Sequence, residues 1–414
     1  MNIVSMSPHI LPSASIDIEP YNDFKIDLDV NRSYTTFHTE DFRRNNINID
    51  LENAIQEDYE HLNARDIGSI NMSYITLNTL NTDLVTLFRA FEDNRAIVSQ
   101  RLNAAAGVHA DTLQANQGYA AGYGRVQQAV LVPTFLATYT GQDVNLINVD
   151  QFDPTKNLVD LIPLPNWTIR YNGLTKMKPF SDLFSRFSVS HGYKSTITVN
   201  QFESDLLFNQ DQPELLKEST LDYYTRFEVP DVVISESFSP LIGINVETKT
   251  GLSTKLEYKK SRNVQMNFLD GALNETRRED FTFGFGYRIS DFKMPFMKDN
   301  SRKKKDDKPA SSNNNRGGRG GNRGGGLNEV GDLSVSLDMS IAEDITYRLV
   351  LDQEVVEPTR GARRVSISPK VEYQYSDALS FRLFFDYTRN EPKVGSFPTT
   401  SARGGIGIIF SLIG

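Results

Sequence analysis

The chain has 414 residues, more than the roughly 100 to 200 of one compact domain, so it forms either several domains or one large β architecture. It carries 44 Lys and Arg against 53 Asp and Glu, a formal net charge of -9, which disfavours a nucleic-acid-binding protein. The absence of cysteine excludes a disulfide framework, a thiolate nucleophile and Cys-ligated zinc or iron-sulfur centres.

Residues 1–77 open with runs in which apolar and polar residues alternate, a period typical of β-strands. The N-terminus lacks the basic start and apolar stretch of a signal peptide, so we interpret the chain as a fragment or a split gene product of a larger protein. The strands expected in this part of the chain cover 15–19, 24–34 and 68–77.

Three oxygen-bearing side chains, Asp27, Asp29 and Asn31, share one face of the second of these strands. Calcium binding is one interpretation of this spacing. No glycine-turned loop and no bidentate glutamate follow, so an acidic stripe facing a water-filled lumen is the preferred interpretation.

Residues 78–165 interrupt the alternation and are expected to form a helical and loop insertion. Thr82 can cap a helix running to about Ala106. Its apolar residues recur at helical spacing and predict a packed stripe: Leu84, Leu87, Phe88, Phe91, Ile97 and Leu102. We expect a second short helix at 133–139, and we expect the insertion to dock on the sheet, narrow one mouth of a pore and contact a partner.

The glycines Gly118, Gly122 and Gly124 resemble a phosphate-binding loop only in composition. No strand precedes them and no Lys-Ser or Lys-Thr pair follows, so a flexible loop is the preferred interpretation.

Alternation returns over 166–292 and again over 331–414, both assigned to strands. In 281–292 the residues Phe281, Phe283, Phe285 and Tyr287 share one parity, and they are expected on one continuous convex face together with Phe381 and Phe385. The remaining expected strands are 166–173, 187–199, 232–238, 241–249, 252–268, 332–341, 345–353, 365–375, 379–388 and 402–412, which brings the total to about 14.

Between these two regions, residues 293–330 are expected to form a disordered, basic Arg-Gly loop. Positions 301–326 hold eight Lys and Arg against two Asp and almost no apolar side chain. Such tracts also occur in proteins that bind single-stranded nucleic acid, but a solvated loop is preferred. Taking the turn at 376–378 as periplasmic and counting alternate crossings predicts this loop outside the cell.

No catalytic, cofactor-binding or metal-binding residues are predicted. The five histidines, His9, His38, His61, His109 and His191, have no partners at metal-ligand spacing. His191 lies near Ser188, Ser190 and Ser195, but a polar residue at a strand end is a simpler interpretation than a Ser-His pair.

Alternation alone is compatible with a soluble β protein or with a membrane barrel. Strands in soluble proteins average about 5 to 6 residues, whereas a tilted membrane strand needs about 9 to 11, and several runs belong to the longer class. The sequence therefore predicts an all-β fold with a helical insertion, with an antiparallel transmembrane β-barrel preferred over a soluble β protein.

Several ordered blocks resemble the C-terminal part of the SprA/Sov family of gliding-motility proteins from Bacteroidetes, the outer-membrane translocon of the type IX secretion system. The blocks are 92–102 (EDNRAIVSQRL), 162–174 (IPLPNWTIRYNGL), 190–195 (SHGYKS), 238–245 (FSPLIGIN), 251–262 (GLSTKLEYKKSR) and 396–400 (SFPTT).

This resemblance implies a non-enzymatic, protein-conducting channel in the cell outer membrane, a larger antiparallel transmembrane β-barrel of which this chain is an incomplete wall segment. Its implied partners are secreted cargo proteins, a porin-like attachment protein, a periplasmic plug protein and the lipid bilayer, with no nucleic acid and no cofactor. A polar, acidic lumen wall would pass cargo without binding it. A small-solute porin or receptor barrel and a surface-attached soluble β structural protein remain alternatives.

Overall fold

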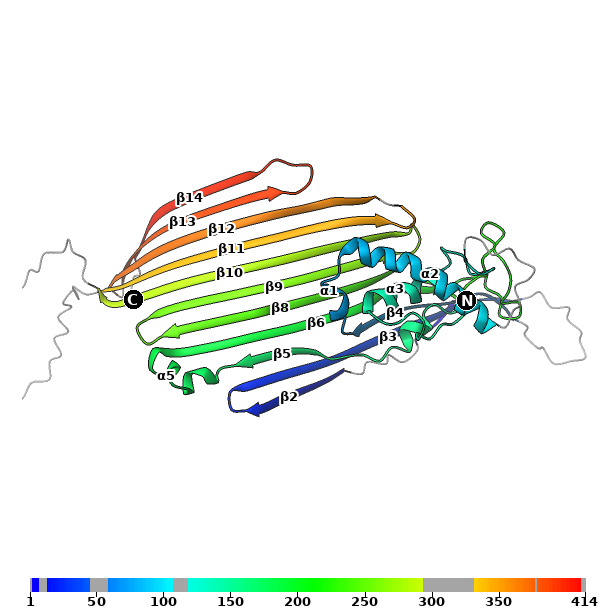
Figure 1. Cartoon of the computed structure of the whole chain (residues 1–414), viewed down its shortest axis with the longest axis horizontal. Coiled ribbons are helices and arrows are strands. Elements are labelled where there is room, and N and C mark those ends of the chain that lie inside the picture. Colours follow the sequence, from blue (N-terminus) through cyan, green and yellow to red (C-terminus); the bar gives the residue numbers. More distant parts are fainter. Residues whose placement is uncertain are drawn as a thin grey trace, which may run out of the picture.

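The computed structural model describes residues 2–6, 13–44, 59–106, 118–292, 331–353, 355–376 and 378–410. Within these ranges the chain is mostly one antiparallel sheet of 14 strands with a helical excursion, as the alternation predicts (Figure 1). The expected Arg-Gly loop at 293–330 lies outside the described residues, as do His9 and His109.

The strands are long. They are β1 (Asn2–Met6), β2 (Ser13–Tyr21), β3 (Phe24–Arg44), β4 (Tyr59–Ser73), β5 (Asn166–Tyr171), β6 (Phe184–Ser204), β7 (Phe227–Glu228), β8 (Asp231–Thr248), β9 (Leu252–Asn267), β10 (Ala272–Phe292), β11 (Gly331–Val350), β12 (Val356–Ser376), β13 (Leu379–Pro392) and β14 (Thr399–Phe410). The helices are α1 (Leu77–Leu80), α2 (Leu84–Ala106), α3 (Gln128–Thr140), α4 (Lys156–Val159), α5 (Phe180–Leu183) and the 3-10 turn η1 (Gly173–Lys176).

The number of strands agrees with the expected number, but several individual strands differ from those predicted. The runs predicted separately at 232–238 and 241–249 form one strand, β8, with an irregularity between Phe238 and Ile242. The runs predicted at 332–341 and 345–353 likewise form one strand, β11. The short strands β1 and β7 were not predicted.

Joining the two halves of β11 overturns the predicted placement of the Arg-Gly loop. With one strand fewer to cross, β10 ends at Phe292 and β11 begins at Gly331 at the same end of the sheet where β12 ends at Ser376. The two strand ends that flank residues 293–330 therefore lie on the side of the turn after Ser376 rather than on the opposite side (Figure 1).

β4 and β5 lie end to end at one position of the sheet, and the helical excursion separates them in the sequence. β4 pairs with one half of β3 and β6, and β5 pairs with the other half of the same two strands in the same direction. The chain leaves the sheet after Ser73 and returns at Asn166, whose side-chain Oδ1 accepts a hydrogen bond from the Ser195 backbone N–H (2.8 Å). A side-chain hydrogen bond thus replaces a backbone pairing where β4 and β5 are interrupted.

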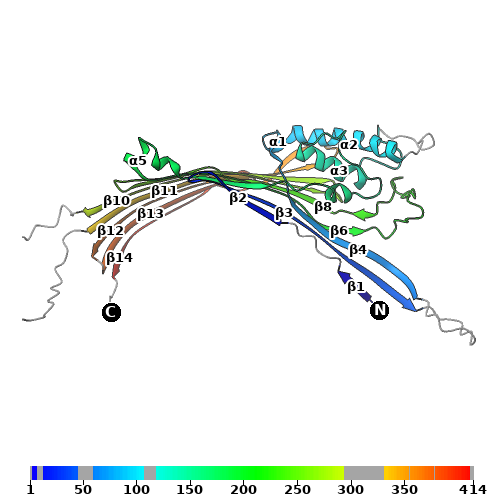
Figure 2. The ribbon, with the colours of Figure 1, turned by 90° about the horizontal axis from the view of Figure 1, so that it is seen from below.

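The sheet is bent into an arch, and α1, α2, α3 and α5 lie on its convex side (Figure 2). The described residues of this excursion, 74–106 and 118–165, pack there against β6, β8, β9 and β10, so the expected docking on the sheet is confirmed. The described residues form no closed pore, so the expected position over a pore mouth stays a prediction; Figure 2 shows the helices of the insertion on the convex side of the sheet.

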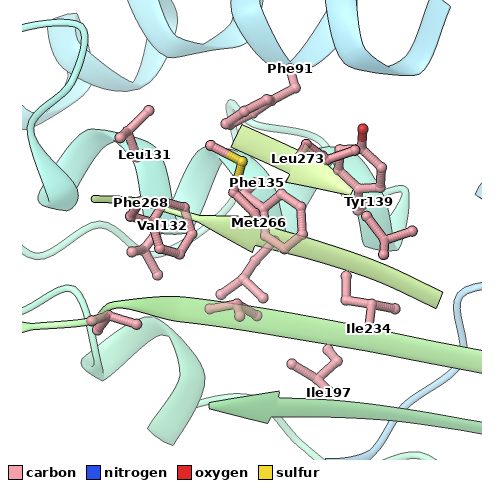
Figure 3. Close-up of a cluster of buried hydrophobic side chains, with 14 of the residues drawn as sticks. Phe91, Leu131, Val132, Phe135, Tyr139, Ile197, Ile234, Met266, Phe268 and Leu273 are labelled. Atoms are coloured by element: carbon pink, nitrogen blue, oxygen red, sulfur yellow. The ribbon is translucent and has the colours of Figure 1, made fainter. Parts of the chain in front are cut away.

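The main hydrophobic core lies between the helices and one end of the sheet. Phe91 of α2 contacts Phe135 and Tyr139 of α3, with ring centroids 5.9 and 6.4 Å apart, and Phe135 contacts Phe268 at the end of β9 (Figure 3). α3 begins at Gln128, earlier than predicted, and contains Pro133. α2 begins one residue later than Thr82 would allow, and its cap is Asp83, whose carboxylate accepts the N–H groups of Val85 and Thr86.

A loop between β6 and β8 completes the helical unit. Tyr223 packs edge-on against Tyr123, with ring centroids 5.2 Å apart. Asp222 accepts the N–H of Gly124 at 2.7 Å, so a carboxylate occupies the place that a phosphate would take in the suspected Gly-rich loop. We use the name helical unit for residues 74–165 together with 205–226.

The sheet is open within the described residues. β14 pairs only with β13, and the opposite edge is formed by β1 and β2, which pair only with β3. No pairing joins the two edges among the residues that the structure describes.

Candidate functional site

The convex face of the wall carries a continuous apolar band. Residues directly opposed in an antiparallel pair point to the same side, so the register of neighbouring strands defines rows across the sheet. One such row runs through Ile244, Leu256, Phe283, Met339, Ile367 and Tyr387. Another runs through Leu252, Tyr287, Val335, Val371, Leu383 and Ile406.

The predicted set Phe281, Phe283, Phe285, Phe381 and Phe385 lies within this band. On β10 the same parity continues into Leu273, which is buried beneath the helices. The band therefore lies on the helix-bearing, convex side, as predicted (Figure 2). Along β10 it covers positions 281–289.

A row of charged residues ends the band on the side of the helical unit. It runs across five neighbouring strands through Lys260, Glu279, Glu343, Arg363 and Glu391. Lys260 Nζ lies 3.8 Å from Glu279 Oε1 within this row. We call this set the charged row.

Two aromatic clusters accompany the band, one of them at its limit beside the charged row. At the level of the charged row, Tyr193 stacks on Trp167 (4.5 Å between ring centroids) and contacts Phe238 (5.1 Å). A second cluster lies where β6 begins: Phe187 contacts Phe180 and Phe184 near α5, at 5.6 and 5.4 Å, and the register places Phe187 level with Phe285. Amphipathic and aromatic rings gather where an apolar layer meets water.

The concave face is polar and carries both signs of charge. On β9 its residues are Ser253, Lys255, Glu257, Lys259, Ser261, Asn263 and Gln265. Neighbouring strands add ion pairs, among them Lys255–Glu257 (3.1 Å), Arg278–Asp280 (2.7 Å), Lys370–Glu372 (3.2 Å) and Arg403–Asp386 (3.0 Å).

The face expected to be acidic therefore carries basic side chains beside its carboxylates. Asp27 illustrates the difference, because its carboxylate lies 3.0 Å from Lys25 and 3.3 Å from Arg170. Asp29 and Asn31 share its polar face, but among the described residues no group of three potential ligands is arranged to hold a metal ion.

A buried polar network joins the wall to the helical unit just beyond the charged row. The Arg262 guanidinium donates to the Thr79 carbonyl (2.6 Å) and to Thr79 Oγ1 (2.8 Å), and it lies 3.4 Å from Glu236. Tyr193 Oη donates to Glu236 Oε1 (2.7 Å). Next to this network, Lys260 donates to the Asn81 side chain (3.1 Å), and Arg277 donates to the Thr82 carbonyl (3.0 Å).

Through these contacts, three cationic side chains of the sheet bind the four-residue segment 79–82 of the helical unit. Lys260, Arg262 and Arg277 come from β9 and β10 and reach the chain between Thr79 and Thr82. Carbonyl groups at the end of a short helix lack intrahelical partners and accept such donors well. Single-sequence reasoning missed this set because its members are separated by nearly 200 positions.

The histidines form no catalytic arrangement. His191 Nδ1 lies 2.7 Å from the Leu241 carbonyl, to which it donates, and Ser188 and Ser190 point to the opposite face. Ser195 instead contacts Thr76 Oγ1 at 3.0 Å. His38 Nδ1 lies 2.7 Å from Asp66 Oδ1, and His61 lies on β4.

Compared with known proteins, the chain matches no protein-family model and no curated protein. Among the residues that the structure describes, no helix is both long enough and apolar enough to cross a membrane. The fold itself is an open antiparallel wall with one apolar and one polar face, bearing a helical unit on the apolar side.

Proposed function

We propose that the chain forms part of the wall of an outer-membrane, protein-conducting channel. The observation that carries this proposal is the convex apolar band over positions 281–289 of β10, bounded on one side by the charged row and by the aromatic cluster of Trp167, Tyr193 and Phe238. A spanning strand needs about 9 to 11 residues, and outer-membrane barrels have an apolar band about 25 Å tall between aromatic girdles. The convex face would then meet lipid, and the concave face would line the channel.

The polar face suits the passage of a protein. Because the charges on this face are paired and of both signs, their electrostatic fields largely cancel. The β9 portion of this face exposes no apolar side chain. Apolar patches are what make protein surfaces adhere to one another, so this β9 portion of the face gives a moving cargo few places to bind. The mechanism is steric and electrostatic, with no chemical step.

The type IX assignment rests on the resemblance of the sequence blocks, and their positions support it. Residues from three separate blocks meet in one place, because Trp167, Tyr193 and Phe238 form the aromatic cluster beside the charged row. The block at 92–102 lies on α2, which packs in the helical unit on the same convex side. By this proposal the chain acts in type IX secretion and gliding motility, with cargo, a porin-like attachment protein and a periplasmic plug as partners.

The test is deletion and complementation in a bacterium that carries the gene. We expect the protein in the outer-membrane fraction, resistant to carbonate extraction, and we expect its loss to abolish secretion of type IX cargo and gliding. Normal secretion with impaired uptake of small solutes would instead favour a porin or receptor barrel. Recovery of the protein in the soluble or carbonate-released fraction would favour a surface-attached β protein.

A further inference from the structure

A cleft lies between the wall and the helical unit on the convex side. β3 and β4 form its floor through Tyr34, Thr36 and Asp66, and its walls come from the segment 150–160 and from the loop between β6 and β8. Its volume is about 670 Å³, within the roughly 300 to 1,000 Å³ typical of small-molecule sites. β3 and β4 slope away from the helices in this region (Figure 2).

The cleft is well separated from the apolar band. Tyr193 of β6 lies at the level of the charged row, and Val199 lies six residues further along the same strand. Val199 is paired with Ile70, and Ile70 is paired with Tyr34. At about 3.3 Å per residue, Tyr34 therefore lies roughly 20 Å beyond the charged row along the strand direction.

Aromatic rings form the apolar part of the lining. Phe152 and Phe208 meet on the wall of the cleft with ring centroids 5.9 Å apart, and both are half-buried. On the floor, Tyr34 stacks on Phe202 with centroids 6.0 Å apart and an interplanar angle of 15°, which holds its ring in one orientation. The face of an aromatic ring carries partial negative charge and attracts C–H groups, such as those on one face of a sugar ring.

The polar part of the lining contains both hydrogen-bond acceptors and donors. Asp153 Oδ1 accepts the N–H and the hydroxyl of Thr155 at 3.0 and 2.6 Å, which fixes the carboxylate, and its Oδ2 has no partner among the described residues. The Arg226 guanidinium lies over the Phe227 ring, 5.1 Å from its centroid, and has no carboxylate partner in the same part of the chain. The described lining thus combines a free carboxylate oxygen with a free guanidinium.

Tyr34 places a hydroxyl among these charges. Burial raises the pKa of Tyr34, the carboxylates of Asp153 and Asp66 raise it further, and Arg226 opposes them. Groups from the floor and from both walls therefore act on this hydroxyl. It keeps its proton at neutral pH and is able to donate a hydrogen bond.

We propose that this cleft binds a neutral oligosaccharide, with the aromatic rings packing against a sugar ring and Asp153, Arg226 and Tyr34 hydrogen-bonding its hydroxyl groups. A sugar hydroxyl both donates and accepts, whereas a carboxylate only accepts and a guanidinium only donates, so the two together match neighbouring hydroxyls. Hydrogen bonds to ionised groups are about twice as strong as neutral ones. A charged ligand would meet a group of its own sign. The cleft is remote from the concave face, so this inference does not rest on the proposed channel function.

The test measures binding to the full protein in lauryldimethylamine oxide, because the headgroups of maltoside detergents are themselves sugars. The neutral probes are maltotriose, cellotriose, mannotriose and triacetylchitotriose, and the charged probes are trilysine and inorganic phosphate. Saturation-transfer NMR detects binding, and calorimetric titration gives the Kd.

Two variants each have a matched control. Tyr34→Phe removes only the hydroxyl, and its control is Tyr21→Phe on β2, where the side chain is 76% exposed and lies outside the cleft. Asp153→Asn keeps Oδ1, and its control is Asp143→Asn. Asp143 Oδ1 also accepts the N–H and the side chain of the residue two positions later, Asn145, so both substitutions perturb the same kind of turn.

We expect at least one neutral trisaccharide to bind, with a Kd that does not change between about 50 and 500 mM salt. Tyr34→Phe should weaken binding by about 3- to 10-fold and Asp153→Asn by at least about 10-fold, while both controls bind as the wild type does. Binding of trilysine or phosphate without a neutral probe would overturn the proposal, and so would the absence of binding by every neutral probe. Equal losses in a variant and its control would also overturn it. If Asp153→Asn misfolds, as judged by proteolysis of the helical unit, Tyr34→Phe decides alone.

Discussion

The guanidinium of Arg262 on β9 and the carboxylate of Glu236 on β8 are directly opposed, lie 3.4 Å apart and are each only 2% exposed beneath the helical unit. Arg262 also holds Thr79 through its carbonyl and hydroxyl oxygens, and Glu236 accepts the Tyr193 hydroxyl. The ion pair therefore connects three strands of the wall to α1. Each charge also has polar neighbours, although Glu236 Oε2 and Arg262 Nε are buried without a hydrogen-bond partner among the described residues.

Replacing Arg262 with Met should destabilise the protein by about 3 to 5 kcal/mol, because Glu236 would be left buried without its partner. The double variant Arg262→Met/Glu236→Leu should recover much of this loss, since no uncompensated charge remains. Denaturant unfolding of the detergent-solubilised protein measures both. Equal destabilisation of the single and double variants would show that the contacts with Thr79, rather than the charge pairing, determine the effect.

The double variant Phe88→Ser/Phe91→Ser should undock the helical unit while leaving the wall assembled. Both rings are buried, and Phe91 contacts Phe135 and Tyr139. Truncating one buried Phe typically costs about 3 to 5 kcal/mol. Limited proteolysis of residues 74–165 measures docking, and membrane fractionation measures assembly.

The matched control for this variant is Ile97→Ser, on the same helix but 38% exposed, which should leave docking unchanged. Under the proposed function, the undocked protein should lose partner retention or show altered secretion. Unchanged secretion and partner recovery with a demonstrably undocked unit would remove the basis for assigning the insertion a functional role.

The two faces of the wall should tolerate charge differently. Phe283→Arg places a cation in the apolar band and should cost about 2 to 4 kcal/mol of folding into lipid, near the middle of a bilayer. Thr282→Arg, one residue away on the concave face, should have little effect because that face already carries ion pairs. Urea-dependent folding into phospholipid vesicles compares the two. Similar tolerance of both substitutions would contradict a lipid-facing convex side.

Docking of α2 should weaken in acid through Asp83. The backbone N–H of Thr86, followed by its hydroxyl and the N–H of Val85, donates to this carboxylate and lowers its pKa below the ordinary value. A depressed folded-state pKa contributes stability above the unfolded value of about 3.9, and that stability is lost as pH falls through the folded value.

The control for this acid effect is Asp83→Asn, which keeps an acceptor at the helix cap but has no proton to gain. Helical content of the wild type and the variant, followed between pH 7 and pH 2, should differ most at low pH, where the variant shows the smaller change. Parallel curves would show that other carboxylates account for the acid response.

Within each strand, the sequence alone was sufficient to sort side chains by face. Period-two alternation is a local property, so Phe281, Phe283 and Phe285 could be placed together without knowledge of their neighbours. The same holds for the helix that became α2, because its apolar spacing differs from that of a strand. Its capping residue was missed by one position, as helix ends often are.

Relationships between strands were decided only by the tertiary structure. The row Lys260, Glu279, Glu343, Arg363 and Glu391 exists because of cross-strand register, which no single stretch of sequence encodes. Register likewise showed that β11 is one strand, which reversed the predicted side of the Arg-Gly loop. The pairings also show that the helical excursion separates β4 from β5 in the sequence, and the helices lie on the convex face. Hydrophobic burial has no preferred direction, so the sequence pattern alone does not say which face of the sheet the helices cover.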